Sequence, residues 1–251
     1  MSKSYKLAGP IGQSATLGLI VLQVDETIEQ DFRRIFVVPE TALYVSRIPS
    51  GAKLTPDTIA QMERDLPYAA HLLPQTAPFD VVGYACTSGT TLIGADRVAD
   101  LVKSNVPTTA VSNPLSSAIA ALHALEAKSV AIVSPYIEPV AIPVRDALCA
   151  AGITVPATLS FGEKVEARVA RIDPASIFEA ALEVDQMANA DAILLSCTNL
   201  RTIDIIEPLE AWLNKPVISS NQALAWHMAQ TVGISLQGEK PGKLFRSSRD
   251  A

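Results

Sequence analysis

Two of the three cysteines in this chain lie at the ends of closely similar stretches of sequence. Cys86 follows the apolar run 81–85, and Cys197 follows the apolar run 192–195 and one serine. A pair of thiols on opposite sides of one bound molecule suits a two-base proton transfer, because one sulfur removes a proton and the other delivers one. The repeated position therefore predicts that Cys86 and Cys197 are a catalytic pair.

Hydroxyl and amide side chains follow each of these thiols. Thr87 and Ser88 come after Cys86, and Thr198 and Asn199 come after Cys197. Hydroxyl side chains favour helix starts, where free amides attract anions. We therefore expect the pKa of the Cys86 thiol to fall from about 8.5 toward neutrality. The same neutral donors are candidates to hold a substrate carboxylate or an enediolate.

Two further side chains are candidates for the same site. Tyr136 follows the apolar run 130–133, where its hydroxyl could donate to a substrate oxygen or simply pack at the rim. Asp25 follows the run 17–22, where it could contact a substrate amine or hydroxyl, or cap the helix that follows. A cysteine after a buried strand is also a common small core residue. Cys149, on an apolar helical face, is expected to be one.

Short apolar runs alternate with segments of helical periodicity along most of the chain. This alternation is typical of βα units and predicts parallel sheets covered on both faces. The expected strands are 17–22, 44–47, 81–85, 108–111, 130–133, 157–161, 192–196 and 216–219. The expected helices are 27–36, 55–73, 96–103, 114–126, 139–151, 174–189, 206–213 and 221–230.

The order of these landmarks occurs twice, which predicts a duplicated α/β domain. The run 17–21 is similar to 130–133, the two cysteine stretches correspond, and 107–113 is similar to 216–221. We expect an N-terminal domain of residues 1–112 plus 229–251 and a C-terminal domain of residues 113–228. Ligands of open α/β sheets bind beyond the carboxyl ends of strands. The site is therefore expected in a cleft between the two domains.

Composition argues against several classes of function. The net charge is −6 and aromatic residues make up 5% of the chain, which disfavours a nucleic-acid surface. No apolar run reaches the roughly 18–20 residues of a membrane span, and no hydrophobic signal segment follows the N-terminus. We expect a cytoplasmic protein without a metal, because the three histidines are scattered and no CxxC occurs. A homodimer is the default expectation for its assembly.

Taken together, four phrases give the chain a family resemblance. They are GYACTSG (83–89), PYI (135–137), LLSC (194–197) and PVISS (216–220). The chain resembles the Asp/Glu racemase superfamily, in the branch that holds maleate cis–trans isomerases, arylmalonate decarboxylases and the ectoine-utilisation protein A group. The resemblance covers nearly the whole chain. It implies two Rossmann-like domains in pseudo-twofold arrangement, an active site between them, and no cofactor or metal.

The resemblance also implies roles for individual residues. In the isomerases the residue matching Cys86 is the nucleophile that adds to the double bond, and the one matching Cys197 is its acid partner. In racemases the pair acts as two opposed acid/base groups. The decarboxylases keep only the cysteine matching Cys197, with glycine where Cys86 stands. Thr87, Ser88 and Tyr136 match donors to a carboxylate or enediolate oxygen, and Thr198 contributes its backbone amide.

Two departures from the maleate isomerases bear on the substrate. Those enzymes carry Pro-x-x-Asn where this chain has Leu-Gln-Val-Asp (22–25), and an asparagine near 162–166, where this chain has charged residues. Asp25 in place of asparagine would repel a dicarboxylate. It suits a substrate with a cationic group, such as an amino acid or an ectoine-derived compound, better than a maleate-like one.

The leading hypothesis is thus a cofactor-independent racemase or isomerase of a small carboxylate. Two alternatives remain open at this stage. One is an arylmalonate-type decarboxylase in which Cys197 delivers the proton. The other is a non-catalytic protein that binds a small ligand and whose thiols are inert.

Overall fold

The two inner strands of the first sheet are buried on both faces, whereas its edge strands are partly exposed. Its central strand consists of eight residues, ATLGLIVL, every one of which is buried, and such continuous apolar runs are typical of covered parallel sheets. The computed structural model describes residues 2–53 and 55–247. The sheet is parallel and has the order β2-β1-β3-β4. Its strands are β1 (Ala15–Leu22), β2 (Thr41–Ile48), β3 (Phe79–Ala85) and β4 (Thr108–Ser112).

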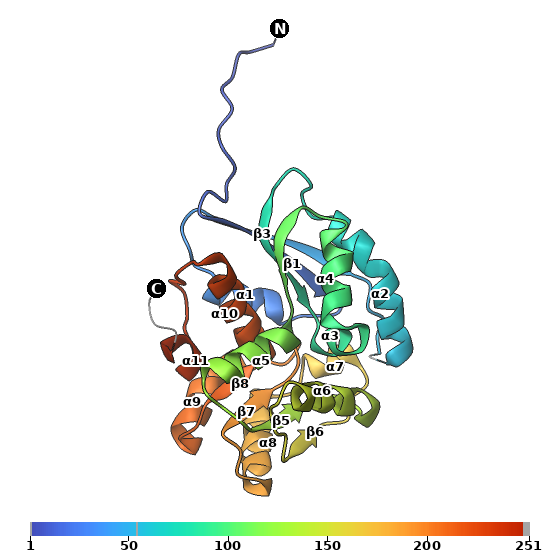
Figure 1. Cartoon of the computed structure of the whole chain (residues 1–251), viewed down its shortest axis with the longest axis vertical. Coiled ribbons are helices and arrows are strands. Elements are labelled where there is room, and N and C mark those ends of the chain that lie inside the picture. The colour runs from blue at the N-terminus through green and yellow to red at the C-terminus, as the bar shows by residue number, and fades with distance from the viewer. Residues whose placement is uncertain (1, 54, 248–251) are drawn as a thin grey trace.

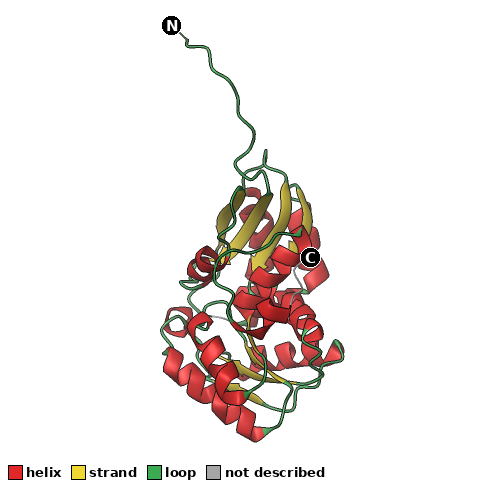
Figure 2. Ribbon diagram, turned by 90° about the vertical axis from the view of Figure 1, so that its left-hand side faces the viewer, coloured by secondary structure: helices red, strands yellow, loops and turns green. Residues whose placement is uncertain are grey.

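The second sheet repeats this arrangement with shorter strands. It is parallel and has the order β6-β5-β7-β8. The first, second, third and fourth strands along each half therefore occupy equivalent positions in the two sheets. Its strands are β5 (Val130–Ser134), β6 (Thr158–Ser160), β7 (Ala192–Leu195) and β8 (Val217–Ser219). The strands gather in two separate groups, one in each half of the molecule (Figure 2). The predicted pair of parallel-sheet α/β domains is confirmed.

Helices separate the strands and cover both sheets. The longer ones are α1 (Ile28–Ile35), α2 (Pro56–His71), α4 (Ala95–Lys103), α5 (Pro114–Ala124), α6 (Glu138–Ala150), α8 (Pro174–Met187), α9 (Ile203–Leu213) and α10 (Ser220–Val232). Helices α2 and α4 pack beside the first sheet, and α8 packs on β5, β6 and β7 (Figure 1). Every predicted strand and helix overlaps an observed element, and most boundaries agree within about three residues.

Three short helices lie outside the predicted helical ranges. They are α3 (Thr87–Ile93), α7 (Glu166–Val169) and α11 (Gly242–Ser247). One or two turns contain too few residues for a 3.6-residue period to appear in the sequence. Two of these helices nevertheless carry residues of the site, since α3 follows Cys86 directly and α7 begins at Glu166.

The C-terminal segment contacts both halves of the molecule. Helix α10 packs against β3 and β4 of the first sheet, whereas α11 packs on α9 and β8 of the second half. Figure 1 shows both helices at the junction of the two sheets. The exact domain boundaries given above stay a prediction. Among the described residues, no helix combines the length and the apolar character that crossing a membrane would require.

Candidate active site

Cys86 stands at the junction between a strand and a helix. It is the residue after β3 and the N-cap of α3, and its Sγ accepts a hydrogen bond from the Gly89 backbone N–H at 3.2 Å. The Ser88 hydroxyl lies 3.7 Å from the same sulfur. Since a thiolate is stabilised by hydrogen bonds to it, these two donors favour the charged form of Cys86.

Cys197 occupies the corresponding place in the second half. It follows β7 by two residues, and its Sγ accepts a hydrogen bond from the Asn199 backbone N–H at 3.4 Å. Tyr136 follows β5, and its hydroxyl is hydrogen-bonded to this thiol. Both thiols therefore contact polar donors, although Cys86 is only 3% and Cys197 only 5% exposed.

The strand ends of the two halves meet at these cysteines. The Thr198 hydroxyl donates to the Ala85 carbonyl at 3.4 Å, which links the residue after Cys197 to the residue before Cys86. The Thr87 hydroxyl lies 2.9 Å from the Ser220 hydroxyl. Tyr136 is close enough to both thiols for their charges to raise the pKa of its hydroxyl. The structure thus brings Cys86 and Cys197 into one cluster, as the duplicated pattern predicted.

The protonation of the thiols differs from the expectation. Burial raises the pKa of the Cys86 thiol to about 12, and the hydrogen bonds from Ser88 and Gly89 lower it only in part. Burial likewise raises the pKa of Cys197 well above its ordinary value. The expected fall of the Cys86 pKa toward neutrality is wrong, because loss of water around the sulfur outweighs the local donors. The carboxylates of Glu166 and Asp25 add to the rise at both thiols.

Asp25 caps the helix that follows it. Its Oδ1 accepts hydrogen bonds from the backbone N–H groups of Thr27, at 2.8 Å, and Ile28, at 2.9 Å. Its Oδ2 is buried and has no hydrogen bond of standard geometry within the described residues. Burial raises the pKa of this carboxyl to about 6, against the lowering effect of the two backbone donors and the Thr198 hydroxyl. One oxygen serves the fold, and the other lies near the thiols.

The side chain of Asn199 is engaged with the protein on both sides. Its Oδ1 accepts from the Glu26 N–H at 2.9 Å, and its Nδ2 donates to the Glu166 carbonyl at 3.2 Å and carboxylate at 3.3 Å. Its own N–H donates to Cys197. Asn199 therefore orders the loop that carries Cys197, whatever further contact it makes with a substrate.

Comparison with known proteins places this site in a family. The family model of arylmalonate decarboxylase matches residues 62–245. The chain belongs to the arylmalonate decarboxylase family. The match contains both cysteines, and it confirms the branch of the Asp/Glu racemase superfamily that the sequence resembles. Members of the family are enzymes, so the protein is an enzyme rather than an inert binding protein.

Relatives in two activity classes cover nearly the whole chain. The chain is 25% identical over 243 residues to a maleate isomerase of Geobacillus stearothermophilus, covering 91% of this chain and 96% of the relative. It is 27% identical over 240 residues to an arylmalonate decarboxylase of Bordetella bronchiseptica, covering 93% of this chain and 97% of the relative.

A solved structure shares the fold. A cysteine-to-serine mutant of the Nocardia farcinica maleate cis-trans isomerase, with a covalently bound succinylcysteine intermediate, superposes with a TM-score of 0.80. It is 22% identical and covers 94% of this chain and 99% of that chain.

Glu166 also belongs to the site, although it was not predicted from the sequence. It begins α7, is 3% exposed, and lies close enough to both thiols for its charge to raise their pKa values. Burial raises the pKa of Glu166 itself to about 7, and the Asn199 hydrogen bond lowers it in part. The one available signal was its position in the charged segment 162–166, where the chain departs from the pattern that the resemblance implies.

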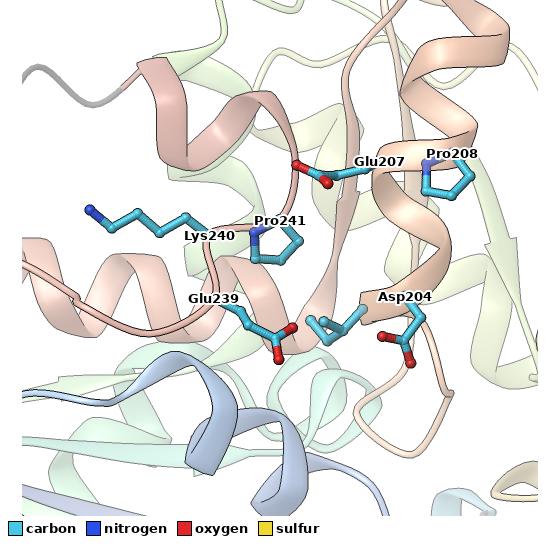
Figure 3. Close-up of a pocket in the computed structure, with 7 residues that line it drawn as sticks. Asp204, Glu207, Pro208, Glu239, Lys240 and Pro241 are labelled. Carbon is cyan, nitrogen blue, oxygen red and sulfur yellow. The ribbon is translucent and has the colours of Figure 1, made fainter.

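A surface pocket elsewhere on the molecule holds none of these residues. It has a volume of about 390 Å³ and lies between α9 and the segment that precedes α11 (Figure 3). Two of its three acidic residues, Asp204 and Glu239, pair with Arg34, at 2.5 and 2.6 Å, and the third, Glu207, pairs with Arg246 at 2.8 Å. The ion pairs of Arg34 join α1 to the second half. The acidic side chains of this pocket therefore have a structural role that requires no ligand. In the described part of the chain, no group of three or more His, Cys, Asp or Glu side chains is placed to hold a metal ion.

Proposed function

We propose that this protein is a cofactor-independent isomerase or racemase of a small carboxylate, in which Cys86 and Cys197 act on opposite sides of one bound molecule. The observation that carries the proposal is the convergence of the two strand ends, with Thr198 bonded to Ala85 and Tyr136 close to both thiols. The presence of both cysteines supports isomerisation, because the resemblance implies that decarboxylases keep only the cysteine that matches Cys197.

Two versions of the reaction use the same pair. In the isomerase version the Cys86 thiolate adds to one carbon of a double bond, and the electron pair passes onto the substrate carboxylate as an enediolate, to which the Cys197 thiol donates as the acid partner. Rotation about the resulting single bond and loss of the thiolate give the other isomer. The succinylcysteine in the Nocardia relative supports this version. In the racemase version one thiolate removes the α-proton and the other thiol reprotonates the opposite face.

Neutral donors are proposed to hold the negative charge that develops in either version. The hydroxyls of Thr87, Ser88 and Tyr136 and the backbone N–H of Thr198 are the candidates. The Thr198 N–H donates to no other described residue, which leaves it for a substrate oxygen. Fixed dipoles in a site with little water stabilise such charge more strongly than the same dipoles would in solution.

The charge of the site supports a substrate that carries a cationic group. Asp25 and Glu166 are buried next to the thiols, and neither forms an ion pair with a described residue. An unpaired buried carboxylate is unfavourable, so a substrate ammonium would offset that cost, whereas a second substrate carboxylate would increase it. This supports an amino acid or ectoine-derived compound over maleate itself.

The test of the two-thiol mechanism uses three matched substitutions. We expect Cys86→Ser and Cys197→Ser each to lower turnover by at least about a thousandfold, because each removes one reacting group. The third cysteine, Cys149, is exposed on α6, so the expectation that it is a small core residue is wrong. Cys149→Ser should therefore leave turnover and the circular dichroism spectrum unchanged. Near-normal turnover in either of the first two variants, with the fold intact, would refute the mechanism.

The substrate is found by incubating the enzyme in deuterated water with amino acids, ectoine-derived acids, maleate and other dicarboxylates. NMR then reads the products. Deuterium at a carbon next to a carboxylate identifies proton transfer, and a changed double-bond geometry without α-exchange identifies addition and rotation. Turnover of maleate faster than of every cationic compound would contradict the proposed substrate class.

Decarboxylation is the second candidate, and the family model and the Tyr136–Cys197 hydrogen bond favour it. In that reaction a malonate-like acid loses carbon dioxide, and Cys197 protonates the resulting enediolate. Carbon dioxide release that persists in Cys86→Ser and disappears in Cys197→Ser would establish it in place of isomerisation.

A further inference from the structure

Tyr84 is a buried phenol beside the Cys86 thiol that the mechanism above does not use. It lies in β3 two residues before Cys86, and its side chain is completely buried. Successive side chains of a strand point to opposite faces, so residues two apart share a face. The position of Tyr84 therefore directs its ring to the side of the strand on which Cys86 stands.

The geometry around Gly89 shows how closely the phenol and the thiol approach. A Cβ placed on Gly89 would lie 2.6 Å from the Tyr84 hydroxyl oxygen and 2.8 Å from the Cys86 Sγ. Both atoms thus occupy the space that any other residue at position 89 would need for its side chain. Glycine at this position is what allows the hydroxyl, the sulfur and the Gly89 N–H to come together.

The Tyr84 hydroxyl has no other evident use. It forms no hydrogen bond of standard geometry within the described residues. Burial, and then the charge and hydrogen bonding of Cys86, raise the pKa of this phenol well above its ordinary value. A buried hydroxyl with no partner except a sulfur atom contributes little to stability, and phenylalanine would fill the same space without the cost of burying a polar group. A hydroxyl at this position is therefore explained best by an interaction with the Cys86 sulfur.

We propose that Tyr84 is a positioning residue for Cys86, whose hydroxyl donates to the sulfur when it becomes a thiolate. With the Gly89 N–H and the Ser88 hydroxyl, it would provide the third donor to this sulfur. Three donors offset part of the opposing effect of burial and of the nearby Glu166 and Asp25 carboxylates. Tyr136 is the other phenol near the pair, and its hydroxyl interacts with Cys197 in the way that the Tyr84 hydroxyl interacts with Cys86.

The catalytic consequence rests on the proposed function, because it assumes that Cys86 reacts as a thiolate. The effect of Tyr84 on the pKa of the Cys86 thiol does not rest on the proposed function. It can be read from the pH dependence of Cys86 alkylation by iodoacetamide in the full-length protein, with mass spectrometry following each cysteine peptide separately.

The decisive variant is Tyr84→Phe, which keeps the ring and removes the donor. We expect the midpoint of Cys86 alkylation to rise by about one pH unit, so that alkylation at a fixed pH below the midpoint slows about tenfold. In the reaction, kcat should fall about tenfold and KM change less than twofold. The control is Tyr44→Phe, at a half-buried tyrosine that packs edge-on against Phe79, for which neither value should move.

An unchanged alkylation midpoint in folded Tyr84→Phe, with an unchanged or raised melting temperature, would show that the phenol only fills space. Should the variant fail to fold, the wild-type protein labelled with 13C at the tyrosine ζ carbon provides the same test. The Tyr84 resonance must then shift over the pH range in which Cys86 is alkylated, and a constant resonance would overturn the proposal. A raised midpoint together with full turnover in Cys86→Ser would instead refute the proposed function and leave the Tyr84 contact standing.

Discussion

Cys86 and Cys197 hold their protons more tightly than a free cysteine because water is largely excluded from both. The same exclusion raises the pKa of Glu166 to about 7 and of Asp25 to about 6. Local hydrogen bonds oppose these shifts without cancelling them. At the scale of the residue, burial therefore keeps both thiols protonated and makes Glu166 and Asp25 titrate closer to neutral pH than free carboxyls do.

A stability prediction follows for Glu166. Its pKa is near 4.5 in the unfolded chain and about 7 in the folded protein. The folded state thus binds this proton more tightly, and the stability it contributes is fully present below pH 4.5 and lost as the pH rises through 7. Glu166→Gln removes the titrating group, so the variant does not lose stability in this way as the pH rises. We expect its free energy of unfolding to exceed the wild-type value by about 2 kcal/mol at pH 8 and to match it near pH 4.

Urea denaturation at the two pH values measures this difference. Glu179→Gln, on the exposed face of α8, is the matched control and should show no pH-dependent difference. A variant less stable than the wild type at pH 8 would contradict the assignment of Glu166 as an unpaired buried carboxylate.

Helix α3 shows how a short element fixes reactive geometry. Cys86 is its N-cap, and the sulfur takes the place of the oxygen that usually accepts from the third residue of the helix. The first turn therefore sets the direction of the thiol. Because α3 has only seven residues and starts directly at the strand end, its position depends on the packing around Gly89 rather than on helix propensity.

Substitution of Gly89 should consequently disable the site. In Gly89→Ala the new Cβ would meet the Tyr84 hydroxyl and the Cys86 sulfur, and neither buried group can move freely. We expect turnover to fall at least about a hundredfold, since small displacements of a reacting group have effects of that size.

Gly83→Ala, in β3 just before Cys86, is the control for that change. Its Cβ would lie 2.8 Å from the Met228 sulfur, which belongs to a flexible side chain that can shift. We expect it to lower turnover less than tenfold. Steady-state kinetics on both folded variants measures this difference. Equal losses of turnover in the two variants would contradict the specific role of position 89.

At the scale of the whole molecule, the two halves are joined through buried polar contacts at the strand ends. Asn221, the second residue of α10, donates to the Asp31 carboxylate at 2.7 Å and to the Thr198 carbonyl at 2.8 Å. It thereby connects α1 of the first half to the loop that carries Cys197. Burial raises the pKa of Asp31 to about 7, and the Asn221 hydrogen bond is the main effect that lowers it.

Loss of this connection should destabilise the fold in a pH-dependent way. Asn221→Ala leaves the buried Asp31 without its donor, and we expect a loss of about 2–3 kcal/mol at pH 8. The loss should be smaller at pH 5, where Asp31 is protonated and needs a donor less. Thermal unfolding at both pH values tests this, with the exposed Asn189→Ala as control. A loss that is the same at both pH values would show that Asp31 is not the group affected.

The sequence by itself determined the architecture and identified the two thiols as candidates for the catalytic pair. Parallel strands buried on both faces are continuous apolar runs, and the alternation with helices made all eight visible. Cys86 and Cys197 could be found because a duplicated unit repeats its strand ends at the same place. These features are local or periodic, so they can be read along the chain.

Only the tertiary structure decided how the site is charged and which neighbours the thiols have. Glu166 is a member of the cluster because a segment distant in the sequence folds onto the thiols, and no local pattern marks it. Tyr84 is close to Cys86 in the sequence, but only the packing around Gly89 shows that its hydroxyl approaches the sulfur. The pKa of Cys86 rises instead of falling because desolvation depends on everything packed around the sulfur, whereas the helix start that suggested a fall is a local feature. Asp25 likewise has one oxygen in a helix cap and the other near the thiols, a division that only the folded chain creates.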